Sequence, residues 1–169
     1  MIASFVLEAS GWARSGLLLR LTVSCTYLLR EVPLHRPSPA PGVVANSLRV
    51  GLGLILAGFA ATLLIPAQRV ALLHLTLMGG FALTALVVAA RVVFGHSGQL
   101  ADLNRRNRWL LVAIGLMVAA MLTRVTGDLV PEIRVSHYNY GAALWILGAA
   151  LWSWKVLPNV LKTEMGWSA

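Results

Sequence analysis

Four long apolar segments, separated by short polar stretches, dominate the hydrophobic pattern of the chain. Each segment is close to the length of about 20 residues that a helix needs to cross the hydrocarbon core of a membrane. Proline, glycine and charged residues occupy the breaks between them. The pattern therefore predicts an all-α protein, a polytopic transmembrane helix bundle with four spans. The predicted spans run from Val43 to Ile65, Val70 to Phe94, Trp109 to Thr126 and Tyr140 to Leu161.

A shorter apolar segment, from Ser15 to Leu29, precedes these spans and is interrupted by Arg20. As a helix it would rise only about 22 Å, which is short for a crossing. Two interpretations stay open: an interfacial helix whose arginines reach water, which we favour, or a fifth span packed on the others. A proline-rich connector follows. We accordingly expect residues 1–42 to form an interfacial or fifth helix with its connector, and residues 43–165 to form the membrane bundle.

Composition supports a membrane protein. Hydrophobic residues make up 58% of the chain and charged residues 12%, and the mean hydropathy is +0.76, beyond the usual range of soluble domains. A net charge of +8 would suggest nucleic acid in a soluble protein, but here the basic residues lie mostly at the ends of the apolar segments. The predicted partner is the lipid bilayer, and no nucleic acid is expected.

Basic residues also predict the orientation of the bundle. They are concentrated in the leader and in the loop after the second span, and such segments remain in the cytoplasm. We therefore expect the N-terminus, the Arg-Arg-Asn-Arg loop and the C-terminus to be cytoplasmic. The residues concerned are Arg30, Arg36, Arg105, Arg106 and Arg108.

Histidines mark the second apolar run, with His74 near its start and His96 just past its end. Histidine is costly in hydrocarbon and its neutral ring is a good metal ligand, so an intramembrane histidine is a functional-site candidate. On a continuous α-helix the two would be separated by about 33 Å and about 40° of rotation, sharing a face but serving two sites on opposite sides. His137 is expected at the level of His74, and His35 at that of His96. A purely structural role stays open for each, and His74 is the strongest candidate.

Small residues form a second feature of this span. Thr76, Gly80 and Thr84 recur at a spacing of four, on a face turned away from His74. Such a row is typical of close helix packing in membranes. The sequence thus predicts a packing face on the second span.

Three arginines, Arg49, Arg91 and Arg124, lie within or at the edges of the spans. No carboxylate is expected inside the four predicted spans. Each guanidinium group is therefore expected to reach the headgroup layer or to meet an anionic ligand such as a haem propionate.

The segment LHLTLMGGFALTALVVAARVVFGHSGQL resembles the NnrS family, in which an Ala/Leu-Leu-His-x-x-x-x-Gly helix ends in Arg-Val-x-x-Gly-His-Ser/Thr-Gly. The fourth span, GAALWILGAALWSWKVLPNVL, is similar to the closing span of that family. The resemblance extends over about Leu48 to Leu161. The positions that match the family motif are His74, Arg91, His96 and Gly98.

The resemblance implies a multi-pass protein of the bacterial inner membrane that contains haem and copper and acts in the nitric oxide response, in resistance to nitrosative stress and in denitrification. It implies metal ligation by His74 and His96, with Arg91 as a further cofactor-binding candidate. His137 is a cofactor-binding candidate because it is expected at the level of His74, where a second axial histidine would have to lie. Turnover of nitric oxide is left open. The family is commonly about twice as long, which leaves three interpretations open: a shortened member, a fragment, or a subunit whose site is completed by a second copy or a partner subunit. A non-catalytic metal carrier or assembly factor and a structural membrane module are the alternatives.

Overall fold

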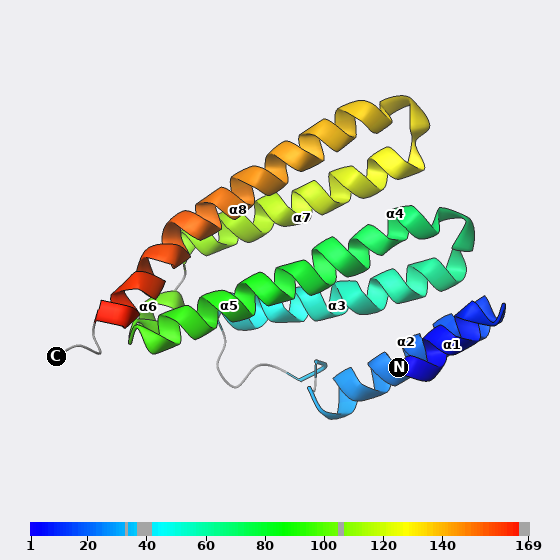
Figure 1. Cartoon of the computed structure of the whole chain (residues 1–169), viewed down its shortest axis with the longest axis horizontal. Coiled ribbons are helices and arrows are strands. Elements are labelled where there is room, and N and C mark those ends of the chain that lie inside the picture. Colours follow the sequence, from blue (N-terminus) through cyan, green and yellow to red (C-terminus); the bar gives the residue numbers. More distant parts are fainter. Residues whose placement is uncertain (33, 37–41, 105–106, 166–169) are drawn as a thin grey trace.

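The computed structural model describes residues 1–32, 34–36, 42–104 and 107–165, and within them the chain forms helices joined by short turns, without a strand. The helices lie as three antiparallel pairs (Figure 1). The all-α architecture predicted from the hydrophobic pattern is confirmed.

In the described residues, four helical segments are long and apolar enough to cross a membrane. The first is α3 (Val43–Leu64), and the third is α7 (Arg108–Leu129). The second and fourth are composite and run over Pro66–His96 and Pro131–Val160. Four spans were expected, and the number is confirmed.

The second span is built from consecutive helical pieces: the 3-10 turn η1 (Pro66–Gln68), α4 (Arg69–His74), the π-helix η2 (Leu75–Ala82) and α5 (Leu83–His96). A π-helix has i to i+5 hydrogen bonds and therefore turns less per residue than an α-helix. The rotation expected between His74 and His96 assumed a continuous α-helix, so that assumption was wrong.

The predicted packing face on this span is confirmed. Thr76 Oγ1 and the Thr76 backbone nitrogen lie against Gly58 of α3, where a Cβ atom on the glycine would approach the nitrogen to 2.9 Å. Thr84 lies in the same way against Gly51. Gly80, midway between the two threonines, receives Ile55. Small residues on both helices thus bring α3 and the second span into close contact.

The fourth span begins earlier than predicted. It opens with the 3-10 turn η3 (Pro131–Ile133) and continues as α8 (Arg134–Met165), whereas the polar residues before Tyr140 had suggested a loop. Proline is well suited to a first helical turn because its backbone nitrogen carries no hydrogen to satisfy. His137, expected in an outer loop, consequently lies inside α8.

The third span ends later than predicted, at Leu129 instead of Thr126. Gly127 suggested a break, but it continues the helix and permits the close approach of α8, since a Cβ atom there would lie 3.0 Å from His137 Cβ. The expectation that no carboxylate lies inside a span is therefore wrong, because Asp128 belongs to α7.

The N-terminal region forms two helices where one was expected, α1 (Ile2–Ala9) and α2 (Ala13–Arg30). Gly11, with φ of +88°, makes the turn between them. Arg20 is buried against Glu8, with a nitrogen to oxygen distance of 2.8 Å, so it does not reach water as the sequence had suggested. Neither helix is among the four candidate spans.

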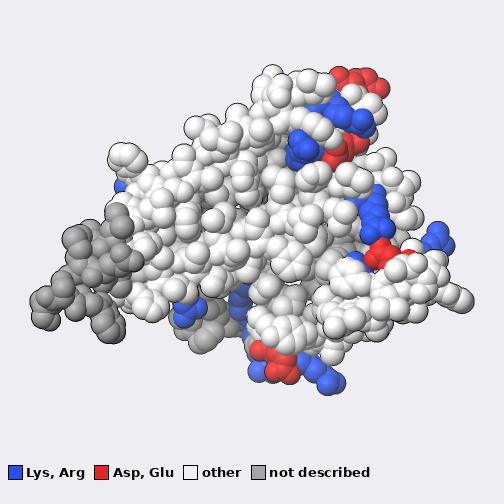
Figure 2. Space-filling view, in the orientation of Figure 1, with Lys and Arg blue, Asp and Glu red and all other residues white. Residues whose placement is uncertain are grey.

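Two ends of the bundle can be distinguished in Figure 1. The turns at Pro66 and Pro131 and the turn between α1 and α2 lie at one end, and the short helix α6 (Leu100–Asn104) and the final turns of α8 lie at the other. Over the middle of the α3–α5 and α7–α8 pairs the face shown in Figure 2 is largely free of charge, as a membrane-spanning surface requires. Arg105 and Arg106 of the predicted orientation signal lie outside the described residues.

A hydrophobic core near α6 ties the two pairs of spans together. It contains Val87 and Ala90 of α5, Leu110 of α7 and Val156 of α8, all nearly or fully buried. Trp152 Nε1 of α8 adds a hydrogen bond of 3.1 Å to the Leu86 carbonyl oxygen of α5. The spans therefore hold a fixed relative position, which in turn fixes the polar side chains at the opposite end.

Candidate functional site

Four polar side chains from three helices meet near the Pro66 and Pro131 turns: His74, Arg124, Asp128 and Tyr138. His74 is the last residue of α4, directly before the π-helix. Arg124 and Asp128 are four residues apart on α7 and therefore share a face. Tyr138 comes from the start of α8. We refer to these four residues as the His74 cluster.

The contacts of the His74 cluster form a closed cycle. His74 Nδ1 lies 3.2 Å from Asp128 Oδ2, and Tyr138 donates its hydroxyl hydrogen to Asp128 Oδ1. The Arg124 guanidinium group stacks over the Tyr138 ring, 3.6 Å from its centroid. Arg124 Nε then donates to His74 Nε2 over 3.4 Å. Every member thus contacts two others.

These partners determine which nitrogen of His74 carries the ring hydrogen. An arginine Nε–H group can only donate, so Nε2 of His74 accepts. The hydrogen is accordingly placed on Nδ1, which faces the Asp128 carboxylate. A carboxylate in this position fixes both the tautomer and the ring orientation, an arrangement that commonly supports a metal-binding histidine.

Two charged or ionisable side chains of the His74 cluster are largely buried. The side chains of His74 and Asp128 are 20% and 9% exposed. Their facing atoms, Nδ1 and Oδ2, lie within ion-pair distance but are not aligned as a hydrogen bond. Ionisable groups inside a membrane span are costly unless they are partnered or functional, which makes this cluster the leading candidate site.

A hollow of about 280 Å³ opens beside the cluster toward the same end of the bundle. Asp128 and Tyr138 contribute to its wall, and so do Arg69 at the start of α4 and Arg134 at the start of α8. The cluster therefore lies next to a polar depression at the end of the spans.

His137 lies at the same end as His74, as expected, but in a different contact. Its Nδ1 lies 3.1 Å from the Ile133 carbonyl oxygen, and its ring packs edge-on against Tyr140 with a centroid distance of 6.2 Å. Within the described part of the chain, no hydrogen bond joins it to His74. The structure brings Asp128, Arg124 and Tyr138 to His74 instead.

His96 and Arg91 lie toward the α6 end and together line a hollow of about 310 Å³ on α5. His96 Nδ1 lies 2.8 Å from the Val92 carbonyl oxygen. A carbonyl only accepts, so Nδ1 carries the hydrogen and Nε2 keeps its lone pair. His35, predicted at this level, is exposed in the connector.

Gly98, the last position of the resemblance motif, has a structural function. Its φ is +70°, the left-handed conformation that glycine supplies at helix ends. The Gly98 nitrogen donates to the Gly95 oxygen over 3.3 Å, and the Gln99 nitrogen donates to the Phe94 oxygen over 2.9 Å. This pair of bonds is a Schellman motif that ends α5 immediately after His96.

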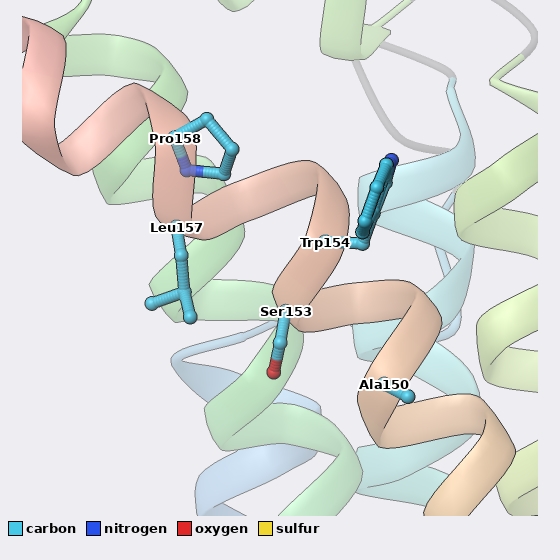
Figure 3. A pocket seen from close by; sticks show the side chains of 5 residues that line it. All are labelled: Ala150, Ser153, Trp154, Leu157 and Pro158. Carbon is cyan, nitrogen blue, oxygen red and sulfur yellow. The ribbon is translucent and has the colours of Figure 1, made fainter.

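The largest of the hollows considered, about 610 Å³, lies on the outer side of α8 and is apolar (Figure 3). Trp154, Leu157 and Pro158 form most of its wall, and Ser153 contributes a hydroxyl group. Among the described residues that line it, none is titratable. Apolar and aromatic side chains of this kind are typical of a surface that contacts lipid.

Metal-binding donors are sparse in the part of the chain that the structure describes. No group of three or more histidine, cysteine, aspartate or glutamate side chains lies close enough to hold an ion there. The imidazole donors of the described residues are separate from one another, at His35, His74, His96 and His137. Such a set fits axial ligation of haem, which needs one or two imidazoles, better than a copper site with three donors from one chain.

Sequence reasoning missed Asp128 and Tyr138. A signal for Asp128 was present, because Arg124 and Asp128 are four residues apart, the spacing that places two side chains on one face of a helix. It was overlooked because Gly127 was taken as the end of the span. Tyr138 could not be recognised while the segment before Tyr140 was taken as a loop.

Comparison with known protein families identifies one match. The family described as NnrS protein covers residues 1–163, so the match also includes α1 and α2, beyond the range recognised in the sequence. Neither the curated proteins nor the solved structures compared contain a match to the chain. Since the family extends over nearly all 169 residues, this chain belongs to the NnrS family.

Proposed function

We propose that this chain is a bacterial inner-membrane protein of the nitric oxide response, which holds haem or copper through histidine and contributes to resistance against nitrosative stress. Membership of the NnrS family supports the biological context. The observation that carries the chemical part is the orientation of His74 by Asp128 inside an apolar span. A polar pair at this depth suggests a function beyond helix packing.

His74 would bind the metal through Nε2. In the described residues this nitrogen is met by Arg124 Nε at 3.4 Å, beyond the usual hydrogen-bond distance of about 2.7–3.2 Å. A metal at Nε2 would therefore replace a weak contact. Asp128 would remain on Nδ1, holding the ring and raising its basicity.

A second site would involve His96 and Arg91 toward the α6 end. His96 presents an exposed ring with its Nε2 lone pair free of the helix backbone. Arg91 lines the same hollow, and its planar guanidinium group fits a carboxylate such as a haem propionate. The two sites would lie at opposite ends of the second span, as the spacing of the histidines suggests.

Bound iron or copper would supply an open coordination position for a diatomic gas such as nitric oxide. The chain itself would supply the imidazole ligand, the carboxylate that orients it and an apolar surrounding that the gas can enter. Further donors for copper would come from a second copy of the chain or from a partner subunit. We propose this assembly because the described residues of one chain offer separate histidines only.

Two experiments on the full chain in detergent test the proposal: an absorption spectrum and a metal analysis. Wild type is expected to show a haem Soret band or bound copper. His74→Ala is expected to lose most of the cofactor, while His35→Ala, a histidine exposed in the connector, should retain it. Copper without haem would favour a metal carrier or assembly factor. Wild type without either cofactor would contradict the proposal.

The closed cycle of contacts also favours an alternative function, a polar clamp that joins α4 to α7 and α8. Each member of the His74 cluster contacts two others, as in a purely structural network. Under this alternative, His74→Ala lowers the thermal unfolding midpoint and wild type carries no cofactor. The same spectra therefore separate the two functions.

A further inference from the structure

The hollow beside the His74 cluster has the charge and the position of an anion site. It has a volume of about 280 Å³ and lies between the start of α4 and the start of α8. Arg69 and Arg134 line it from these two helices, and so does Gln68. Both helices begin at the edge of a candidate span, so the hollow lies at the boundary between membrane and water.

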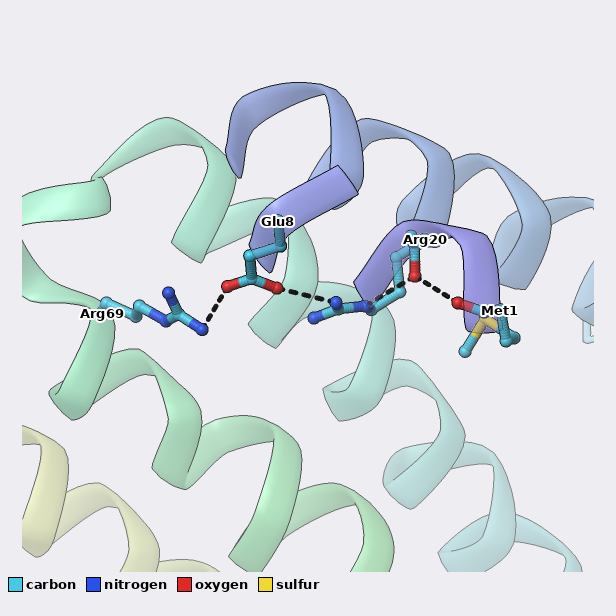
Figure 4. A network of polar contacts seen from close by, with 5 residues as sticks. Met1, Glu8, Arg20 and Arg69 are labelled. Atoms are coloured by element: carbon cyan, nitrogen blue, oxygen red, sulfur yellow. Dashed lines mark hydrogen bonds and ion pairs between the residues drawn. The ribbon is translucent and has the colours of Figure 1, made fainter. Parts of the chain in front are cut away.

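Arg69 already binds an oxyanion from this chain. One of its terminal nitrogens forms an ion pair with Glu8 Oε1, and Glu8 Oε2 takes a bond from Arg20 (Figure 4). A guanidinium group has five N–H donors, and the Arg69 side chain is 50% exposed. It can therefore hold Glu8 with one edge while its other donors face the hollow.

Arg134 is the second cation. It lies exposed at the first residue of α8. In the part of the chain that the structure describes, no carboxylate forms an ion pair with it, in contrast to Arg69. A guanidinium group without a carboxylate partner attracts an anion from outside the chain.

Among the described residues of the wall, Asp128 supplies the carboxylate, and it is already occupied. Asp128 accepts from the Tyr138 hydroxyl at Oδ1 and faces His74 Nδ1 with Oδ2. Its charge is thereby directed into the His74 cluster. With Glu8 and its second partner Arg20 included, three arginines stand against two carboxylates, so the described residues at the hollow keep a positive balance.

We propose that this hollow binds an oxyanion, held between the guanidinium groups of Arg69 and Arg134. The planar fork of arginine matches the oxygens of phosphate and similar anions. A free inorganic anion and the phosphate of an anionic lipid headgroup share this chemistry. Glu8 competes with the anion for Arg69. The proposal is independent of haem or copper at His74.

Binding of inorganic phosphate to the full chain in detergent, at constant ionic strength, tests the proposal by phosphorus NMR titration. Arg134→Gln is expected to weaken binding about tenfold or more, because one charge-assisted contact is lost. Arg14→Gln, a change at an exposed arginine outside the hollow, should bind as wild type does. Glu8→Gln should bind phosphate more tightly, since it releases Arg69.

A second arm examines lipid as the source of the anion. Nanodiscs with and without phosphatidylglycerol are compared by measuring the lipid that the purified protein retains. Saturable phosphate binding that depends on Arg134 supports a free anion, and retention of phosphatidylglycerol that depends on Arg134 supports the headgroup. If neither probe distinguishes wild type from Arg134→Gln, the proposal is overturned. If Arg134→Gln fails to fold, Arg134→Lys tests the same point. It keeps the charge but not the planar fork, so an intermediate loss of phosphate affinity is expected.

Discussion

Asp128 Oδ2 lies 3.2 Å from His74 Nδ1, joining the end of α7 to the end of α4 across the two pairs of spans. The carboxylate comes from the final turn of its helix, where the helix dipole disfavours negative charge. The hydroxyl of Tyr138 and the N–H of His74 offset this disadvantage. Asp128 is therefore held by contacts with other helices rather than by its own.

Replacing Asp128 by asparagine should destabilise the bundle by about 1–3 kcal/mol, the cost of leaving a buried polar group unsatisfied. Asparagine removes the negative charge that faces His74 Nδ1 and leaves one acceptor oxygen in place of two. The thermal unfolding midpoint in detergent measures the loss, and any cofactor at His74 should be retained less well. Glu132→Gln, at an exposed carboxylate in the adjacent turn, is the control. Equal midpoints for the two variants would contradict the role given to Asp128.

The contact between α3 and the π-helix yields a second prediction. Gly58→Ala places a Cβ atom 2.9 Å from the Thr76 nitrogen, so backbone must shift, at a cost of about 1–3 kcal/mol. Gly53→Ala on the same helix meets nothing within 4 Å and should be neutral or slightly stabilising, because alanine favours helix. Thermal unfolding of both variants measures the difference. Similar losses at the two positions would show that the packing face is not where the structure has it.

The helices α1 and α2 form an N-terminal hairpin, and its docking on the second span through Glu8 and Arg69 should depend on pH. Burial alone would raise the pKa of Glu8, but the hydrogen bond from Arg20 and the charge of Arg69 outweigh burial and lower the pKa below its ordinary value of 4.5. A lowered pKa in the folded state means that the stabilisation is fully present above about pH 4.5 and is lost as the pH falls through the folded value. Protonation of the Glu8 carboxylate at low pH removes the negative charge that Arg20 and Arg69 contact.

Hydrogen exchange in α1 and α2 measures this docking. Exchange, corrected for the intrinsic effect of pH, should be slow at neutral pH and rise below pH 4.5. Glu8→Gln should show the fast exchange already at pH 7, and its exchange should no longer respond to acid. If the amides of α1 and α2 exchange as slowly in Glu8→Gln as in wild type at pH 7, the ion pairs of Glu8 do not hold these helices in place.

The predicted orientation can be measured in intact cells. In a Cys25→Ser background, Ala67→Cys and Ala101→Cys place one exposed cysteine at each end of the bundle. If the basic loop is cytoplasmic, a membrane-impermeant maleimide should label position 67 in intact cells and position 101 only after the cells are broken. The reverse labelling would show that the bundle has the opposite orientation in the membrane.

Most of the fold could be predicted from the sequence, because long apolar segments in a membrane have few alternatives to helix. The packing face at Gly80 could also be predicted, since small residues at a spacing of four indicate close approach. The π-helix after His74 could not, as it depends on contacts with α3 and α7 that no local pattern encodes. The same applies to the ends of the third and fourth spans.

The candidate site was predicted in part. His74 was identified because an imidazole in an apolar run is conspicuous. Its partners were not, because Gly127 and the polar residues before Tyr140 carry the local features of a loop. Helix packing overrode those features: Gly127 lies against His137 Cβ at a close approach that a larger side chain would prevent. A glycine can mark either a break or a contact, and only tertiary structure distinguishes them.

The central claim, that His74 binds a metal cofactor, is tested most directly by the absorption spectrum of the reduced full chain before and after addition of nitric oxide. We expect a Soret band in wild type that shifts on addition of the gas, a loss of that response in His74→Ala and its retention in His35→Ala. Wild type with neither a Soret band nor copper by metal analysis, or a shift that persists unchanged in His74→Ala, would contradict it.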